Sequence, residues 1–255
     1  MNLLLDLGNT RLKWALAHGG EWLARGAVAW DEDVPAVLAQ AWRELPRPAQ
    51  VFGASVVDGA RETRVAALAV SAFAQDVTWL RTPVAACGVR NAYAEPQRLG
   101  VDRFLSMVAA HAAGDSPCVL AGIGTALTLD ALAADGRHLG GLIAPGPRLM
   151  QQSLLGATAR VRPERPGRVL EAADNTADAV ASGCWLAAVA LIERFAARMS
   201  PELGGAPRLV VHGGDAGELL PLLALPARQA ADSVLRGLAA WAADPGAAIA
   251  PGTPT

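Results

Sequence analysis

A short glycine-containing turn that follows an apolar run occurs twice in this chain, and this repeat is the feature that most constrains the fold. The first copy, Asp6-Leu7-Gly8-Asn9-Thr10, follows residues 3–5, and the second, Gly122-Ile123-Gly124-Thr125, follows residues 118–121. Each copy leads into two further β-like runs, and Gly19-Gly20 and Asp135-Gly136 mark the tight turns between them. A three-strand unit that occurs twice predicts two related halves.

The residue types in these turns suit a phosphate ligand. Glycine allows the backbone to adopt a positive φ and to approach a ligand closely. Asn9, Thr10 and Thr125 add side-chain donors beside the free backbone N–H groups. Two such turns, one from each half, could grip one polyphosphate, so the repeat indicates ATP chemistry.

Composition and charge exclude several classes of protein. The chain has 255 residues, of which 52% are hydrophobic, so it is long enough for one large or two smaller globular domains. A formal net charge of −2 argues against nucleic acid or an anionic membrane as the main partner. No Lys or Arg precedes the first apolar run, which Asp6 ends, so we expect no secretory signal. The longest apolar stretch, residues 184–192, is too short to span a bilayer.

The cysteines favour a reducing, cytoplasmic location. Cys87, Cys118 and Cys184 are widely spaced and form no CxxC pair. We therefore expect three small buried hydrophobic residues, with neither a disulfide framework nor a structural zinc site.

Beyond the repeat, strands alternate with helices, which is typical of an α/β fold. Apolar residues recur at helical spacing from Val37 to Leu45, and a buried strand follows at residues 51–57. Residues 88–103 are predicted to form an irregular polar connector before a helix that begins at Phe104. We expect an N-terminal half at residues 1–115, a C-terminal half at 116–245 and a frayed tail at 246–255. Two β-β-β-α-β-α-β halves around a cleft describe the actin-like ATPase architecture of sugar kinases and Hsp70.

Three charged residues near the turns are candidates for metal or phosphate binding. Asp6 ends the first strand, where a carboxylate can hold Mg²⁺ directly or through water; the alternative is an aspartate that caps the turn. Lys13 could reach a phosphate or lie exposed on an edge strand. Asp130 shares a strand face with Thr128, so it could orient water on Mg²⁺ or be a solvated strand residue.

Asp102-Arg103 is the best candidate for a catalytic pair. Phosphoryl transfer to an alcohol needs a carboxylate that accepts the hydroxyl proton and a cation that binds an anionic group. Arginine binds a carboxylate through two parallel hydrogen bonds, and Gly100 allows a close approach. The alternative is a helix start with Asp102 as N-cap, which the spacing alone favours.

Five segments in this order carry a family resemblance. They are Asp6 to Thr10, Asn91 to Arg103, Gly124 to Asp130, Gly140 to Gly146 and Asn175 to Gly183. From Asn2 to about Leu238 the chain resembles type III pantothenate kinase, and the Gly-x-Asp-Arg element with its upstream Tyr93 is specific to that family. The resemblance implies an actin-like fold, a homodimer, and ATP- and Mg²⁺-dependent phosphorylation of pantothenate to 4'-phosphopantothenate, the first step of coenzyme A synthesis.

The resemblance also implies roles for individual residues. The ATP-binding positions are Asp6, Leu7, Gly8, Asn9, Thr10, Arg11, Leu12 and Lys13 in the first turn and Gly124 and Thr125 in the second. The pantothenate-binding positions are Tyr93, Gly100, Val101, Asp102, Arg103 and Thr176, with Asp102 as proton acceptor. Because the pantothenate site of this family lies near the dimer interface, Thr176 is expected to act from the partner subunit.

One position departs from the family pattern. The family commonly has an Asp two residues before the Gly-Thr pair, as a ligand for an activating monovalent cation, whereas this chain has Gly122. The missing carboxylate puts a K⁺ or NH₄⁺ site in question. His111 and His212 receive no functional role from the sequence.

Two further functions remain as alternatives. One is a non-enzymatic accessory factor for transcription, which has been described for proteins of this family. The other is a different actin-like small-molecule kinase, acting on a sugar or on acetate. The Asp102-Arg103 pair and both glycine turns favour an enzyme, and Tyr93 with the segment from Gly100 to Arg103 argues against a different small-molecule kinase.

Overall fold

The computed structural model describes residues 1–244, which form two compact units. The first unit contains residues 1–114 and the described chain from Asp232 onward, and the second contains residues 115–231. The expected frayed tail at 246–255 lies outside the described residues.

The first unit is built on a five-stranded sheet with the order β3-β2-β1-β4-β5. Its strands are β1 (Asn2–Leu7), β2 (Arg11–His18), β3 (Glu21–Ala29), β4 (Gln50–Ser55) and β5 (Val77–Trp79). The central strand β1 pairs antiparallel with β2 and parallel with β4. Gly19 and Gly20 close the turn between β2 and β3 with φ of +58° and +87°, a conformation that glycine adopts at no steric cost.

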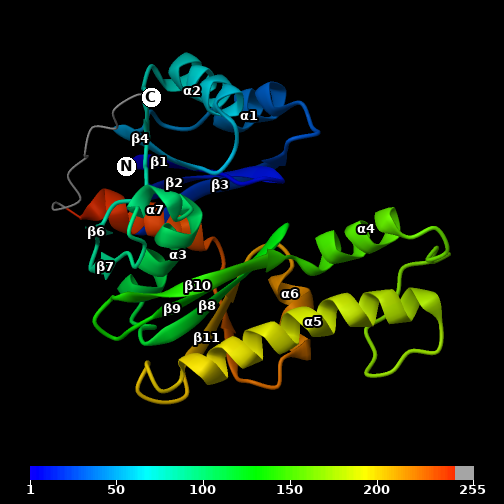
Figure 1. Ribbon diagram of the computed structural model, residues 1–255. Coiled ribbons are helices and arrows are strands. Elements are labelled where there is room, and N and C mark those ends of the chain that lie inside the picture. The colour runs from blue at the N-terminus through cyan, green and yellow to red at the C-terminus, as the bar shows by residue number, and fades with distance from the viewer. Residues whose placement is uncertain (245–255) are drawn as a thin grey trace. The chain divides into compact units, whose positions relative to one another are not determined.

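Helices cover both faces of this sheet (Figure 1). They are α1 (Val34–Trp42), α2 (Gly59–Phe73), α3 (Val101–Ala112) and α7 (Ser233–Ala243). Because successive side chains of a strand point to opposite faces, Leu3, Leu5 and Leu7 pack with α1 and α2, whereas Leu4 packs with α3 and α7. The apolar run that opens the sequence therefore supplies two cores.

The last described helix, α7, belongs to the first unit, whereas the expected division placed residues 232–245 in the second half. The packing of α7 against α3 explains the difference. A Cβ on Gly237 would lie 2.1 Å from the backbone oxygen of Leu105, so the two helices meet backbone to backbone. Leu235 and Leu238 of α7 are buried in the same core as Leu4.

The second unit repeats the first, as the sequence predicted. Its strands are β8 (Cys118–Ile123), β9 (Ala126–Leu132), β10 (His138–Pro145), β11 (Arg208–His212) and β12 (Ala227–Gln229). Their order is β10-β9-β8-β11-β12, with β8 antiparallel to β9 and parallel to β11. Each strand thus occupies the place of its counterpart in the first sheet.

The helices of the second unit are α4 (Pro147–Ala157), α5 (Thr176–Met199), α6 (Ala216–Leu219) and the short 3-10 helix η2 (Leu220–Leu222). The helix α5 lies along the sheet of this unit (Figure 1). Its residues Trp185, Ala188 and Ile192 belong to the core of the unit. The long helix α5 is therefore a core element of the second unit.

By length and composition alone, α5 could cross a membrane, although no continuous apolar run in the sequence is long enough. Half of its most apolar window is buried inside the protein. The core of the second unit accounts for this apolar character.

Candidate functional site

The first glycine turn holds a carboxylate and an amine side by side. Asp6 lies near the end of β1, and Lys13 is its direct partner across the antiparallel pair with β2. The turn closes with a hydrogen bond from the Gly8 N–H to the Arg11 carbonyl oxygen (3.1 Å). The Trp30 indole N–H donates to the Gly8 carbonyl oxygen (2.7 Å). Trp30, which sequence reasoning did not select, therefore fixes the turn from the end of β3.

The glycines of the two turns provide open space, not an unusual backbone conformation. We expected Gly8 and Gly124 to adopt positive φ, but neither does. A Cβ on Gly124 would meet no atom within 4 Å, and one on Gly8 would make only an ordinary 3.4 Å contact with the Arg11 oxygen. The absence of a side chain leaves the backbone of each turn uncovered.

The environment of Asp6 disfavours its charged form. Removal from water raises the pKa of the Asp6 carboxyl from 3.8 to about 7, and the charges of Asp102 and Asp232 add to the rise. Lys13 opposes the shift without cancelling it. Additional positive charge at this point would restore the carboxylate, so Asp6 is suited to a cationic ligand.

The segment expected to be an irregular connector is more ordered than predicted. It contains β7 (Val89–Arg90), which forms a small hairpin with the preceding β6 (Ala85–Ala86), the 3-10 helix η1 (Pro96–Arg98), and the first turn of α3. Asp102 and Arg103 therefore lie inside a helix that begins three residues earlier than expected. Gly100 is the N-cap, so the alternative in which Asp102 caps the helix is wrong.

Glycine at position 100 makes room for the carboxylate of Asp102. A Cβ on Gly100 would lie 2.5 Å from Asp102 Oδ1. The same oxygen accepts a hydrogen bond from the Arg103 N–H (2.8 Å). A carboxylate in the first turn also interacts favourably with the helix dipole.

Tyr93 and Arg103 meet directly. Arg103 is buried, and its Nη1 donates to the Tyr93 hydroxyl (3.2 Å) while the guanidinium lies 5.9 Å from the centre of the tyrosine ring. Asn91 sets the position of Tyr93, because its Oδ1 accepts from the Tyr93 N–H (2.9 Å) and its Nδ2 donates to the Pro96 carbonyl oxygen (3.1 Å). Asn91 is a second organising residue that the sequence did not single out; its side chain two residues before Tyr93 in a Pro-containing loop was the available signal.

The second glycine turn is enclosed by two other glycine segments. Gly146, at the start of α4, donates its N–H to the Thr125 carbonyl oxygen (2.9 Å), and a Cβ there would lie 1.9 Å from the Gly124 oxygen. Gly213, with φ of +102°, would place a Cβ 2.1 Å from the Ile123 oxygen. Only glycine fits at these two positions, because both segments pack directly against the backbone of the turn.

The space beside Gly122 is filled by two side chains. A Cβ on Gly122 would lie 2.6 Å from Thr128 Oγ1 and 2.9 Å from His212 Cε1. His212 thus reaches the strand that leads into the turn.

Asp130 is neither solvated nor near the turn. It is buried in β9, and Oδ1 lies 2.9 Å from His138 Nε2, both side chains being almost inaccessible. Asp130 follows Thr125 by five positions, about 17 Å along an extended strand. Among residues 1–244, no cluster of three or more His, Cys, Asp or Glu side chains could hold a metal ion.

The other residues predicted to bind ATP or pantothenate differ in the solvent exposure of their side chains. Leu7, Leu12 and Val101 are core side chains, so only their backbone is available to a ligand. Asn9, Thr10, Arg11, Thr125 and Thr176 are exposed. Thr176 is the first residue of α5, in the second unit.

Of the three cysteines expected to be buried, Cys118 and Cys184 are buried and Cys87 is only partly buried. All three are free, and burial raises the pKa of the Cys87 and Cys118 thiols to about 12 and that of Cys184 above its usual value.

Comparisons with known proteins agree on one family. The family model described as type III pantothenate kinase matches residues 2–198. A type III pantothenate kinase of Xanthomonas oryzae pv. oryzae is 45% identical over 239 residues, which cover 94% of this chain and 96% of the relative. A type III pantothenate kinase of Xanthomonas campestris pv. campestris is 44% identical over the same shares.

Solved structures support the fold. A protein described as a 2-dehydro-3-deoxygalactonokinase from Sinorhizobium meliloti matches with a TM-score of 0.62 at 16% identity, covering 94% of this chain and 97% of its own. A protein described as a Baf family transcriptional activator from Campylobacter jejuni matches with a TM-score of 0.60 at 18% identity, covering 93% and 95%. At these identities the likeness concerns the fold alone, and it confirms the predicted actin-like, sugar-kinase-like α/β architecture.

The raised pKa of Asp6 predicts a pH-dependent component of stability. Between about pH 4 and pH 7 the folded carboxyl keeps a proton that the unfolded one has lost, so stability falls as pH rises through this window. The slope is at most about 1.4 kcal/mol per pH unit. We expect Asp6→Asn to lack this component. The free energy of unfolding of the variant minus that of the wild type, measured by urea titration without nucleotide, should therefore increase between pH 5 and pH 8. Parallel pH profiles of the two proteins would contradict the assignment.

Proposed function

The chain belongs to the type III pantothenate kinase family, and from this membership we propose that it transfers the γ-phosphoryl group of ATP to the primary hydroxyl of pantothenate, forming 4'-phosphopantothenate and ADP. The observation that carries the proposal is the Asp102-Arg103 pair in the first turn of α3, with Tyr93 on the guanidinium. A carboxylate and an anion-binding cation at adjacent positions are the two groups that this reaction requires.

In the proposed reaction Asp102 is the proton acceptor. The substrate hydroxyl oxygen forms a bond to the γ-phosphorus, the bond between this phosphorus and the bridging oxygen breaks, and ADP leaves with the electron pair. The hydroxyl proton passes to the Asp102 carboxylate, which the helix dipole keeps available as a base. Gly100 serves this step by leaving the carboxylate unobstructed.

Arg103 would bind the carboxylate of pantothenate. Arginine stays protonated in proteins and presents a planar fork that matches a carboxylate. Tyr93 contacts this fork through its hydroxyl and its ring face, and Asn91 holds Tyr93 in place. The orientation of the guanidinium is therefore set before substrate arrives.

ATP would be bound by the residues from Asp6 to Lys13 and by Gly124 and Thr125. The family also implies a divalent cation, and the residues fit Mg²⁺. Mg²⁺ keeps several waters and shares one or two carboxylates with substrate phosphates, so one aspartate is sufficient. Asp6, with its disfavoured charge, is the residue that would hold the ion, and the ion would supply positive charge that neutralises the phosphates. Lys13, the cross-strand partner of Asp6, would bind phosphate oxygens. Because Asp130 lies in β9 against His138, our proposal does not include it in this site.

We further propose a homodimer in which Thr176 completes the pantothenate site of the partner subunit, as the family resemblance implies. The three free cysteines fit a reducing cytoplasm. The Campylobacter jejuni protein named as a transcriptional activator shares only the fold with this chain at 18% identity, so it does not favour a regulatory role.

The direct test is ATP-dependent phosphorylation by the purified protein, with pantothenate, a panel of sugars, and acetate as acceptors. Pantothenate alone should be phosphorylated, and Asp102→Asn should reduce kcat by about 10²- to 10⁴-fold because an amide cannot accept the proton. The thermal midpoint of this variant should stay close to that of the wild type. Transfer to a sugar or acetate, or near-normal turnover by the variant, would contradict the proposal.

Arg103→Lys should weaken pantothenate binding more than ATP binding. A point charge replaces a fork that makes two parallel bonds, which should cost about 1–3 kcal/mol, or roughly 5- to 150-fold in the KM for pantothenate. Separate KM values for the two substrates decide the matter. An effect confined to ATP would assign Arg103 to a phosphate group.

The absence of a side-chain oxygen at position 122 should make activity depend only weakly on K⁺ or NH₄⁺. Hard cations need several oxygen ligands, and backbone and water alone give a weaker site. The measurement is a titration of each cation against a Na⁺ or Tris background at fixed ionic strength and saturating Mg²⁺. A wild-type protein that is inactive without K⁺ or NH₄⁺ would show that other groups complete the coordination.

Two variants, Gly122→Asp alone and together with Thr128→Ala, provide a second test of the K⁺ dependence. Gly122→Asp alone should lower stability, because its Cβ would collide with Thr128 and His212, although the backbone does not require a positive φ. Combining it with Thr128→Ala removes the nearer of the two obstacles. The double variant should therefore gain the stronger K⁺ dependence.

A further inference from the structure

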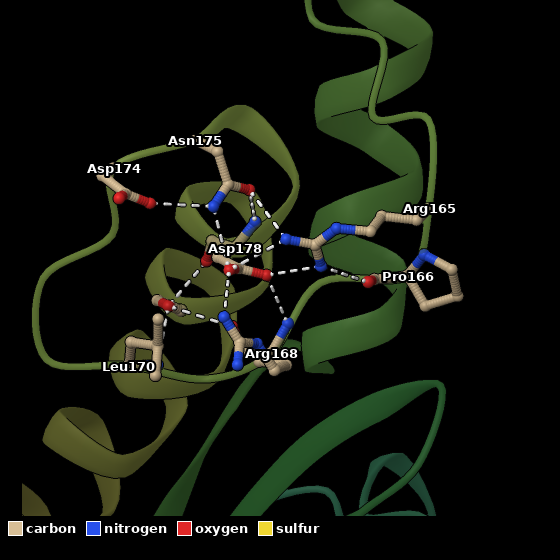
Figure 2. Close-up of polar contacts among 8 residues, drawn as sticks. Arg165, Pro166, Arg168, Leu170, Asp174, Asn175 and Asp178 are labelled. Atoms are coloured by element: carbon tan, nitrogen blue, oxygen red, sulfur yellow. Dashed lines mark hydrogen bonds and ion pairs between the residues drawn. The ribbon is translucent and has the colours of Figure 1, made fainter.

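A buried carboxylate in the second unit is surrounded by donors from one loop. The side chain of Asp178, in the first turn of α5, is inaccessible to solvent. Arg165 binds it through two hydrogen bonds, from Nη1 to Oδ1 (2.9 Å) and from Nη2 to Oδ2 (3.1 Å). Arg168 donates its backbone N–H to Oδ1 (2.8 Å) and its Nη2 to Oδ2 (3.3 Å). Figure 2 shows these donors converging on Asp178.

The same carboxylate also fixes the start of α5. Asn175, the N-cap, accepts from the Asp178 N–H (3.0 Å) and donates its Nδ2 to Asp178 Oδ2 (2.9 Å). Arg165 reaches Asn175 as well, from Nη2 to Oδ1 (3.3 Å). Asp178 thus ties the residue immediately before Thr176 to the loop that precedes it. The hydrogen bond from Arg165, followed by that from the Arg168 backbone, holds the pKa of Asp178 well below its usual value.

The loop lies directly on the helix. A Cβ on Gly167 would lie 2.0 Å from the Ala177 carbonyl oxygen, so the loop backbone touches the helix backbone there. One turn further on, Ser182 Oγ accepts from the Leu170 N–H (2.9 Å) and donates to the Asp178 carbonyl oxygen (2.6 Å). Residues 165–170 are therefore held to the first two turns of α5 at three points.

A pocket lies next to the segment where residues 165–170 contact α5. It has a volume of about 540 Å³, and its walls include Leu154 of α4, Val161, and the stretch from Ala173 to Thr176. Thr176 is one of the residues that line this pocket, whereas the solvent-inaccessible Asp178 is not. The shape of one wall therefore depends on how residues 165–175 are held.

We infer that Asp178 is a positioning residue for pantothenate binding, acting through Arg165 and Asn175 to fix Thr176 and the pocket wall that precedes it. The inference rests on the proposed function, since it takes Thr176 as a pantothenate contact. Asp178 has no free acceptor direction toward the pocket, because two arginines and Asn175 occupy its oxygens. Its effect on substrate must pass through the neighbours that it holds.

The test compares Asp178→Asn, Arg165→Gln and the double variant in steady-state kinetics. Each single variant should raise the KM for pantothenate about 10- to 100-fold, in line with loss of charge-assisted hydrogen bonds, while the KM for ATP and kcat change less than about threefold. The double variant should be no worse than the more affected single variant, because both changes break one interaction. Arg165 has a half-exposed side chain, so Arg165→Gln keeps the test available if Asp178→Asn does not fold.

Asp135→Asn is the matched control. It removes one carboxylate of an ion pair in the same unit, with Arg137 at 2.8 Å, but on an exposed turn far from the pocket in sequence and fold. Its KM values should equal those of the wild type. Size-exclusion chromatography should give one oligomeric state for all the variants.

Three outcomes overturn the inference. Unchanged pantothenate KM in an active Arg165→Gln protein would remove the positioning role and leave the proposed function standing. Equal rises in both KM values, with a falling thermal midpoint, would mean that Asp178 serves only general stability. A wild-type protein that does not phosphorylate pantothenate would reject the proposed function, and the inference with it.

Discussion

The hydrogen bonding of the central strands β1 and β8 along both edges is the constraint on which the rest of the molecule depends. Each is paired antiparallel on one side and parallel on the other, so neither has a free edge. A strand fixed in this way can offer its backbone to a ligand only where it ends. The register then decides which side chains arrive there: Asp6 opposite Lys13 in the first unit, and the Gly124 turn in the second. Both candidate phosphate turns follow from one pairing pattern used twice.

The elements that the sequence predicted are those set by short-range patterns. Apolar runs separated by the tight-turn signals Gly19-Gly20 and Asp135-Gly136 were sufficient to predict the three-strand repeat. The return of α7 to the first unit was not predictable in this way, because it depends on Gly237 meeting the backbone of Leu105, far away in the chain. The order within residues 85–103 was missed for a related reason. The structure of that segment depends on hydrogen bonds such as that between Asn91 and Tyr93, which the spacing of apolar residues does not reveal.

The candidate site shows the same division. Residue types and spacing were enough to select Asp6, Asp102 and Arg103, whose chemistry is visible in their side chains. Trp30 was missed because an indole in an apolar run looks like a core residue, whereas its N–H fixes the first turn. Asp130 was left between metal binding and solvent because its partner, His138, comes from the neighbouring strand. The glycines within the two turns leave open space beside the backbone. The positions where a side chain would collide with the backbone are Gly146 and Gly213, which pack against the second turn from other elements.

Two aspartates illustrate how the surroundings of a carboxylate determine its role. Burial raises the pKa of Asp6 to about 7 despite the attraction of Lys13, so this carboxylate is unfavourable as an anion until more positive charge arrives. The Asp178 side chain is inaccessible to solvent, yet the bonds from Arg165 and Arg168 lower its pKa, and its oxygens are fully used within the protein. A buried carboxylate with too little positive charge around it is stabilised when it binds a cation. A carboxylate whose oxygens already accept hydrogen bonds from the protein is not stabilised further by a ligand, so its role is to hold its neighbours in place. The first arrangement suits a site for Mg²⁺ and phosphate, and the second suits a support for the residues that contact the other substrate.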